Sequence, residues 1–89
     1  MNTETYKVLS IDAWREPGGW TWNQWYLVGT VELETLDSPR KVLSAMRNAG
    51  YLSDDSKGRV YLDDDQYNIV VCDRNNGRPL FAIEYGSKS

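Results

Sequence analysis

The spacing of apolar residues changes along the chain and predicts its elements one after another. Apolar and polar residues alternate over residues 5–14 and again from Trp20 to about Glu34, as they do along β-strands. In the first of these segments the odd positions, beyond Lys7, form the more continuously apolar face. The stretch 15-REPGG-19 separates the two segments, and its proline and glycines predict a turn. The first third of the chain is therefore expected to form two strands.

The segment 37-DSPRKVLSAMRNAGYL-52 predicts the single helix. Its apolar residues recur at helical spacing and give one stripe: Val42, Leu43, Met46 and Ala49. Ser38 is placed to cap the N-terminus, with Pro39 at the first helical position. Gly50 is a natural left-handed residue after the helix, and Tyr51 is expected to fold back on Met46 in a Schellman ending.

The last third predicts three short strands, at 59–62, 66–73 and 79–85, with a turn at 63–65. The stretch 74-RNNGR-78 indicates a hairpin, for which two registers compete. A two-residue loop would set Ile69 opposite Glu84. A three-residue loop with Gly77 left-handed would set Ile69 opposite Ile83, Val71 opposite Phe81 and Tyr67 opposite Tyr85, and we favour it because it places the large apolar pairs on one face. The order β-β-α-β-β-β predicts an α+β fold, with one helix on a mainly antiparallel sheet of about five strands.

Three of the four tryptophans fall within six residues, in 20-WTWNQW-25. Strict alternation would point Trp20 and Trp22 away from Trp25, so we expect a bulge near Asn23-Gln24 that shifts the phase. We predict Trp14 and Trp25 in the core. For Trp20 and Trp22 the pattern leaves core and surface equally open.

Composition indicates one soluble domain spanning residues 1–89, with residues 1–4 and 86–89 as flexible tails. No apolar run approaches the roughly 20 residues of a membrane helix, and the N-terminus does not have the pattern of a signal peptide. A single cysteine, Cys72, allows no internal disulfide. We therefore expect a cytoplasmic protein without a membrane association.

The chemistry available to the chain argues against an enzyme. It contains no histidine, which removes the common nucleophile pairs and imidazole metal ligands. Cys72 lies in an apolar strand, where a thiol is normally inert. Asp63, Asp64 and Asp65 lack the spacing, glycine and distal glutamate of a calcium loop, so we interpret them as a solvated turn. We expect no catalytic residue, no bound metal and no cofactor.

Two surfaces remain as candidate binding sites. Trp20, Trp22 and Tyr26 form the first, since aromatic side chains on a strand supply interface hot spots or stack bases and sugars. The second is the polar side of the helix, where the basic residues are Arg40, Lys41 and Arg47. The simpler interpretation of that side is an ordinary solvated helix face. Three basic residues in a chain of net charge −3 give only a weak electrostatic indication of nucleic-acid binding.

The combination of 12-DAW-14 with 19-GWTWNQWYLVG-29 resembles small uncharacterised proteins encoded by bacteriophages. The resemblance covers the first third of the chain and assigns no site residues. It implies a context only, that of an early or accessory phage protein acting in the cytosol of a bacterial host.

From these observations we predict a small non-enzymatic binding protein that occludes a host or phage protein through Trp20, Trp22 and Tyr26. A rigid aromatic surface loses little conformational entropy on binding. An aromatic strand is also an edge through which the chain could form a homodimer. The alternative is a single-stranded nucleic-acid-binding protein that stacks bases on the tryptophans and holds phosphates with the basic helix side. A small-molecule or sugar site would need a concave pocket, which sequence does not reveal.

Overall fold

A computed structural model describes residues 3–64 and 68–84, with the side chains of Gln24 and Trp25 left out of the description. Its strands are β1 (Glu4–Glu16), β2 (Gly19–Leu33), β3 (Val60–Asp64), β4 (Asn68–Asp73) and β5 (Pro79–Glu84). Helix α1 (Pro39–Asn48) and a short 3-10 helix η1 (Asp54–Ser56) lie between β2 and β3. The strands form one antiparallel sheet in the order β2-β1-β5-β4-β3. The predicted α+β fold is confirmed.

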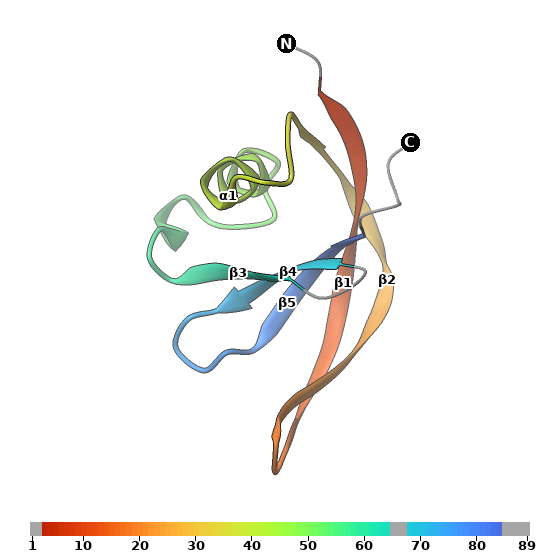
Figure 1. Cartoon of the computed structure of the whole chain (residues 1–89), viewed down its shortest axis with the longest axis vertical. Helices are drawn as coiled ribbons and strands as arrows, with labels where there is room; N and C mark the ends of the chain where they lie inside the picture. Colours follow the sequence, from red (N-terminus) through yellow and green to blue (C-terminus); the bar gives the residue numbers. More distant parts are fainter. Residues whose placement is uncertain (1–2, 65–67, 85–89) are drawn as a thin grey trace.

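The long β1–β2 hairpin projects well beyond the other three strands, and α1 lies over the opposite end of the molecule (Figure 1). α1 joins the two edge strands of the sheet, and so it has to cross one face, which we call the helix face. The far side of the sheet is called the second face. Within the described residues no helix has the length and apolar character required to cross a membrane.

Helix α1 begins and ends as predicted. The Ser38 hydroxyl accepts the backbone N–H of Lys41 at 3.4 Å, and Pro39 occupies the first turn. At the other end Tyr51 N–H donates to Met46 O and Gly50 N–H donates to Arg47 O, both at 3.0 Å. These two bonds define a Schellman ending, and Gly50 adopts the left-handed φ of +89° that it requires.

The β4–β5 hairpin has the favoured apolar pairs, but the predicted three-residue loop is wrong: Asp73 N–H donates to Arg78 O at 2.8 Å, so the loop covers the four residues 74–77. Ile69 lies opposite Ile83 and Val71 lies opposite Phe81, while Gly77 is left-handed with φ of +76°. The predicted Tyr67–Tyr85 pair lies outside the described residues. Leu80 is an extra residue on β5, because the next pair after Val71–Phe81 is Cys72–Pro79. This bulge shifts the pairing by one residue just before the turn.

The main core lies between α1 and the helix face. It contains Val42 and Met46 of the helix and, from the sheet, Tyr6, Val8, Val31, Leu33, Val60, Ile69, Val71 and Ile83. On β1 this core therefore uses the even positions 6 and 8, not the more continuously apolar odd ones. The odd positions Leu9 and Ala13 lie on the second face, where Ala82, Val70 and Cys72 are also buried. The sheet is thus apolar on both faces, although the described helix covers one.

Strand β1 begins inside the segment predicted as a flexible N-terminal tail. Glu4 already belongs to β1 and pairs with Leu33, the last residue of β2. The predicted tail at 86–89 lies outside the described residues.

Candidate binding surfaces

Two bulges in β2 decide which aromatic side chains lie together. β1 pairs without interruption, whereas β2 has one extra residue at Val28 and another at Trp25. The predicted phase shift therefore exists, at Trp25 rather than at Asn23-Gln24, and a second one follows it. Trp20 and Trp22 lie opposite Arg15 and Ala13 and so face the second side, while Tyr26 lies opposite Ser10 on the helix face. The structure does not bring Tyr26 together with Trp20 and Trp22.

Trp20 is half-buried and tied to the β4–β5 turn. Its indole Nε1 donates to the backbone oxygen of Asn76 at 2.8 Å, across 56 positions of sequence. The guanidinium carbons of Arg15 and Arg78 lie 5.1 and 5.6 Å from the centroid of its ring. The Arg15 Nη1 also reaches Asn76 O, at 3.5 Å. Trp20 therefore links the end of the β1–β2 hairpin to the β4–β5 turn, and we call this connection the clip. Its ring is not freely exposed.

A small pocket of about 240 Å³ opens on the second face beside this clip. Trp20, Trp22 and Tyr61 contribute aromatic walls, and Val70, Cys72 and Pro79 are buried residues that line it. Asp63, Asp64 and Gly77 complete the lining. The sequence left both core and surface open for Trp22. Its side chain is half-buried and forms one wall of the pocket. We call this cavity the second-face pocket.

Cys72 is buried, and its thiol is not an activated nucleophile. Burial raises the pKa of the Cys72 thiol, and the negative charge of Asp63 raises it further. The pKa of Tyr61 is raised mainly by the charge that Cys72 carries when ionised, with burial second. At neutral pH both groups are therefore protonated, and Cys72 serves as an apolar pocket residue.

The exposed large hydrophobic residues lie on the β1–β2 hairpin. Among the side chains that the structure describes they are Trp14 (39% exposed), Tyr26 (56%), Leu27 (53%) and Val28 (38%), which we call the hairpin strip. The prediction that Trp14 belongs to the core is wrong. Trp14 pairs with Thr21 near the end of the hairpin, which projects away from α1 (Figure 1), and its indole donates to Glu16 Oε1 at 2.9 Å. The side chain of Trp25 lies outside the described set.

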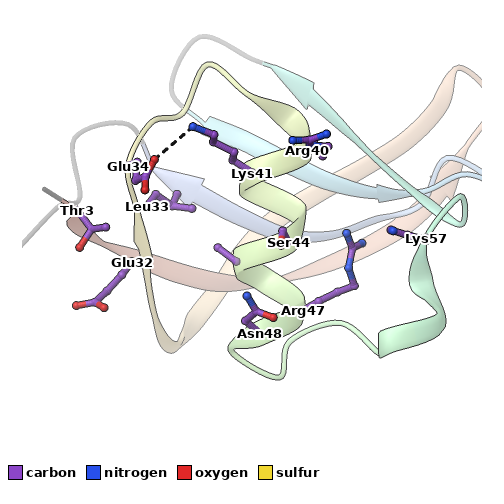
Figure 2. Close-up of a pocket in the computed structure, with 11 residues that line it drawn as sticks. Thr3, Glu32, Leu33, Glu34, Arg40, Lys41, Ser44, Arg47, Asn48 and Lys57 are labelled. Atoms are coloured by element: carbon purple, nitrogen blue, oxygen red, sulfur yellow. Dashed lines mark hydrogen bonds and ion pairs between the residues drawn. The ribbon is translucent and has the colours of Figure 1, made fainter. Parts of the chain in front are cut away.

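The basic helix side lines a shallow groove of about 500 Å³ between α1 and the end of β2 (Figure 2). The lining includes Arg40, Lys41 and Arg47 together with Lys57, but also Glu32 and Glu34. Lys41 Nζ is 3.3 Å from Glu34 Oε2, and Arg47 donates to Ser56 Oγ at 3.4 Å. Since two of the three predicted cations already have partners, the groove resembles an ordinary solvated helix face more than an anion site.

Three arginines of the second face were not predicted as site residues. Arg15, Arg74 and Arg78 come from β1 and from the β4–β5 turn, and all three are exposed beside the aromatic rings of the pocket. One signal was available: in 74-RNNGR-78 the two arginines flank a hairpin turn and must therefore lie near each other. Their proximity to Trp20 depends on tertiary closure and leaves no local trace.

The turn predicted at 63–65 is wrong over its described residues, which belong to a strand. Asp63 and Asp64 end β3, and Asp65 lies outside the description. No cluster of three or more potential metal-ligating His, Cys, Asp or Glu residues occurs within the part of the chain that the structure describes.

Comparison of the chain with protein families, with curated proteins and with solved structures gives no match.

Proposed function

We propose that the chain is a small non-enzymatic binding protein that attaches to a protein partner through the hairpin strip. The observation that supports this most directly is the gathering of exposed large hydrophobic side chains on one hairpin. Trp14 and Tyr26 share the helix face of the hairpin, because Trp14 and Ser10, the partner of Tyr26, both occupy even positions of β1, whereas Leu27 points to the second face. At least 38% of each side chain of the strip is exposed. Exposed apolar groups that cluster in this way are typical of interaction surfaces, whereas scattered ones need no explanation.

The strip has the physical properties of a preformed interface. Its residues are carried by hydrogen-bonded strands, and the Trp14 indole is held by Glu16. Aromatic side chains on a rigid backbone bury a large area for little lost rotamer freedom. Binding through Trp14 and Tyr26 replaces the predicted use of Trp20 and Trp22, because those two rings are engaged with the β4–β5 turn and the pocket.

The bulges favour contact through side chains over addition of a strand. β2 is an edge strand, and a regular edge offers its backbone to a neighbouring strand. Extra residues at Trp25 and Val28 interrupt the regular repeat in the segment that carries the strip. A partner is therefore expected to bury the exposed side chains rather than to extend the sheet. A host or phage protein fits this role under the phage-like context, and occlusion of the partner's surface is the simplest mechanism.

The experiment introduces a photo-crosslinking amino acid at Tyr26 in bacteria, with Arg40 as the matched control position on the helix side. A protein crosslinked from position 26 and not from position 40 is then purified, and its affinity is measured by calorimetry. The Trp14→Ser/Tyr26→Ser variant should bind it at least 30-fold more weakly, about 2 kcal/mol, while keeping its far-ultraviolet spectrum. Equal crosslinking from both positions, or unchanged affinity of the folded variant, contradicts the proposal. Crosslinks to a second copy alone would replace the heterologous partner with a homodimer.

A further inference from the structure

Three arginines and two aromatic rings form a second cluster that the hairpin strip does not use. Arg15 and Arg78 lie over Trp20, and the guanidinium carbon of Arg74 lies 5.5 Å from the centroid of Tyr61. These residues come from β1, β2, β3 and the β4–β5 turn, so the fold assembles them from distant segments. All three arginines are exposed. Stacking on a ring restrains a guanidinium group yet leaves N–H donors for an anion.

The second-face pocket adjoins this cluster and shares Trp20 and Tyr61 with it. Its volume of about 240 Å³ is below the roughly 300 Å³ at which pockets for whole drug-sized ligands begin. It therefore suits one ring of a larger molecule. The walls and floor, from Trp22 to Val70 and Cys72, are aromatic or apolar and match the flat face of such a ring.

Two carboxylates, those of Asp63 and Asp64, line the pocket, and the cations lie beside it. Asp63 lines the pocket and offers carboxylate oxygens, whereas Arg15, Arg74 and Arg78 contact the rings without lining the pocket themselves. A complementary ligand has a flat ring with N–H donors on its edge and negative charge a short distance away. Those features together describe a nucleotide.

We propose that the second-face pocket binds one base of a single-stranded nucleic acid, while Arg15, Arg74 and Arg78 contact the adjoining phosphates. A base must be unpaired to enter a pocket of this kind, and aromatic stacking with flanking cations is how proteins hold single strands. Asp63 accepts a hydrogen bond from the base edge, as carboxylates do from the N4 amino group of cytosine. The site is independent of the hairpin strip and does not rest on the proposed protein partner.

A cationic peptide is the competing ligand, because aromatic walls with a carboxylate also suit an ammonium group. Three exposed arginines beside Trp20 and Tyr61 outnumber the two lining carboxylates, oppose the approach of a cation and attract phosphates. The charges therefore favour the nucleic acid.

The test measures fluorescence anisotropy of labelled oligo(dC) and oligo(dT), each of about 12 nucleotides, a length within the usual site size of single-strand-binding folds. Wild type should bind oligo(dC) more tightly than oligo(dT) and more tightly than the same sequence in a duplex. Trp22→Ala should weaken binding at least fivefold, the lower end for loss of one stacked base. Asp63→Asn should reduce the preference for oligo(dC).

The arginines have a matched control. Arg15→Gln/Arg78→Gln and Arg40→Gln/Arg47→Gln remove the same charge from opposite sides of the sheet. The first pair should weaken binding more than tenfold and reduce the slope of log affinity against log salt by about 1.4, that is, about 0.7 for each phosphate that the protein no longer neutralises. The second pair should change affinity by less than about twofold, as distant screened charges do. Circular dichroism checks that each variant is folded, and the arginine pairs suffice if Trp22→Ala does not fold.

Four results would overturn the proposal. They are no binding of either oligonucleotide at low salt, an equal loss in both arginine pairs, binding of free cytidine monophosphate as tight as that of the strand, and tighter binding of a trimethyl-lysine peptide than of oligo(dC). The third would reassign the pocket to a free nucleotide and the fourth to a cation cage.

Discussion

Gly29 allows a test of how β2 and the end of the helix fit together. It lies opposite Val8 on the helix face, and a Cβ added there would overlap the Tyr51 hydroxyl and lie 3.2 Å from Tyr51 Cζ. That hydroxyl donates to Thr30 O at 2.9 Å, and the Tyr51 ring packs edge-on against Phe81 with centroids 5.8 Å apart. Gly29→Ala must therefore displace Tyr51 from both of these partners.

The expected cost follows from these two interactions. Loss of the hydrogen bond removes about 1 kcal/mol and loss of the ring packing about another 1 kcal/mol. Alanine in place of glycine within a strand returns about 0.5–1 kcal/mol, because it restricts the unfolded chain and its backbone conformation here is not left-handed. The net loss of unfolding free energy is about 1 kcal/mol, which urea unfolding resolves in a domain of this size.

Repeating Gly29→Ala in a Tyr51→Phe protein distinguishes the steric overlap with the hydroxyl from a general effect of alanine on the strand. Tyr51→Phe removes the overlapping hydroxyl, so Gly29→Ala in that background should cost far less than in wild type, with a coupling energy of about 1 kcal/mol. If Gly29→Ala instead stabilises wild type by the amount expected for an unconstrained strand, the packing of Tyr51 over Gly29 is refuted.

The remaining predictions address the helix cap, the clip and the buried thiol. Ser38→Ala should lower the unfolding free energy by about 0.5–1 kcal/mol in urea titration, with Ser38→Thr as the conservative control, because the cap bond to Lys41 is long. Trp20→Phe keeps an aromatic ring but lacks the indole N–H that donates to Asn76, and should cost at least about 1 kcal/mol in the same assay; no change would show that the bond is not maintained in solution. Cys72 should react with an aromatic disulfide reagent only as the protein unfolds, and rapid reaction of the native protein would contradict its burial. Folding raises the pKa of Cys72 above its ordinary value of 9.0, so the unfolded chain releases the thiol proton at a lower pH than the folded chain does. The contribution of Cys72 to the unfolding free energy should therefore be constant below pH 9.0 and fall as pH rises from 9.0 toward the raised pKa, and Cys72→Ala should lose less stability over that interval.

The sequence predicted best what short-range chemistry determines. Ser38, Pro39 and Gly50 bound the helix through interactions within a few residues, and the hairpin register follows from Gly77 and the apolar pairs around it. The bulges were harder, because an extra residue at Val28 leaves the local pattern of alternation plausible in either phase. The bulge at Val28 places Leu27 on the second face although Val31 and Leu33 lie on the helix face. The bulge at Trp25 separates Tyr26 from Trp22, which changed the candidate surface.

Contacts across the sheet could not be predicted from local pattern at all. Trp20 meets Asn76 only because β1 pairs with β5 and brings the end of the first hairpin to the last turn. The exposure of Trp14 likewise depends on how far the hairpin extends beyond α1, which the apolar character of its neighbours does not indicate. The arginine cluster and the pocket are products of this long-range closure.

The position of β1 inside the sheet has a consequence for how the chain is made. β1 and β2 leave the ribosome first, yet the inner edge of β1 pairs with β5, and Val8 meets Ile83 near the end of the chain. Until β5 has been synthesised, the early hairpin exposes both an unpaired strand edge and its apolar side chains. Such pairing between distant segments slows folding, and an unpaired apolar edge is the usual route to aggregation. We therefore expect nascent chains truncated before β5 to depend on chaperones, and chains that include β5 to be released from them once Ile83 has emerged.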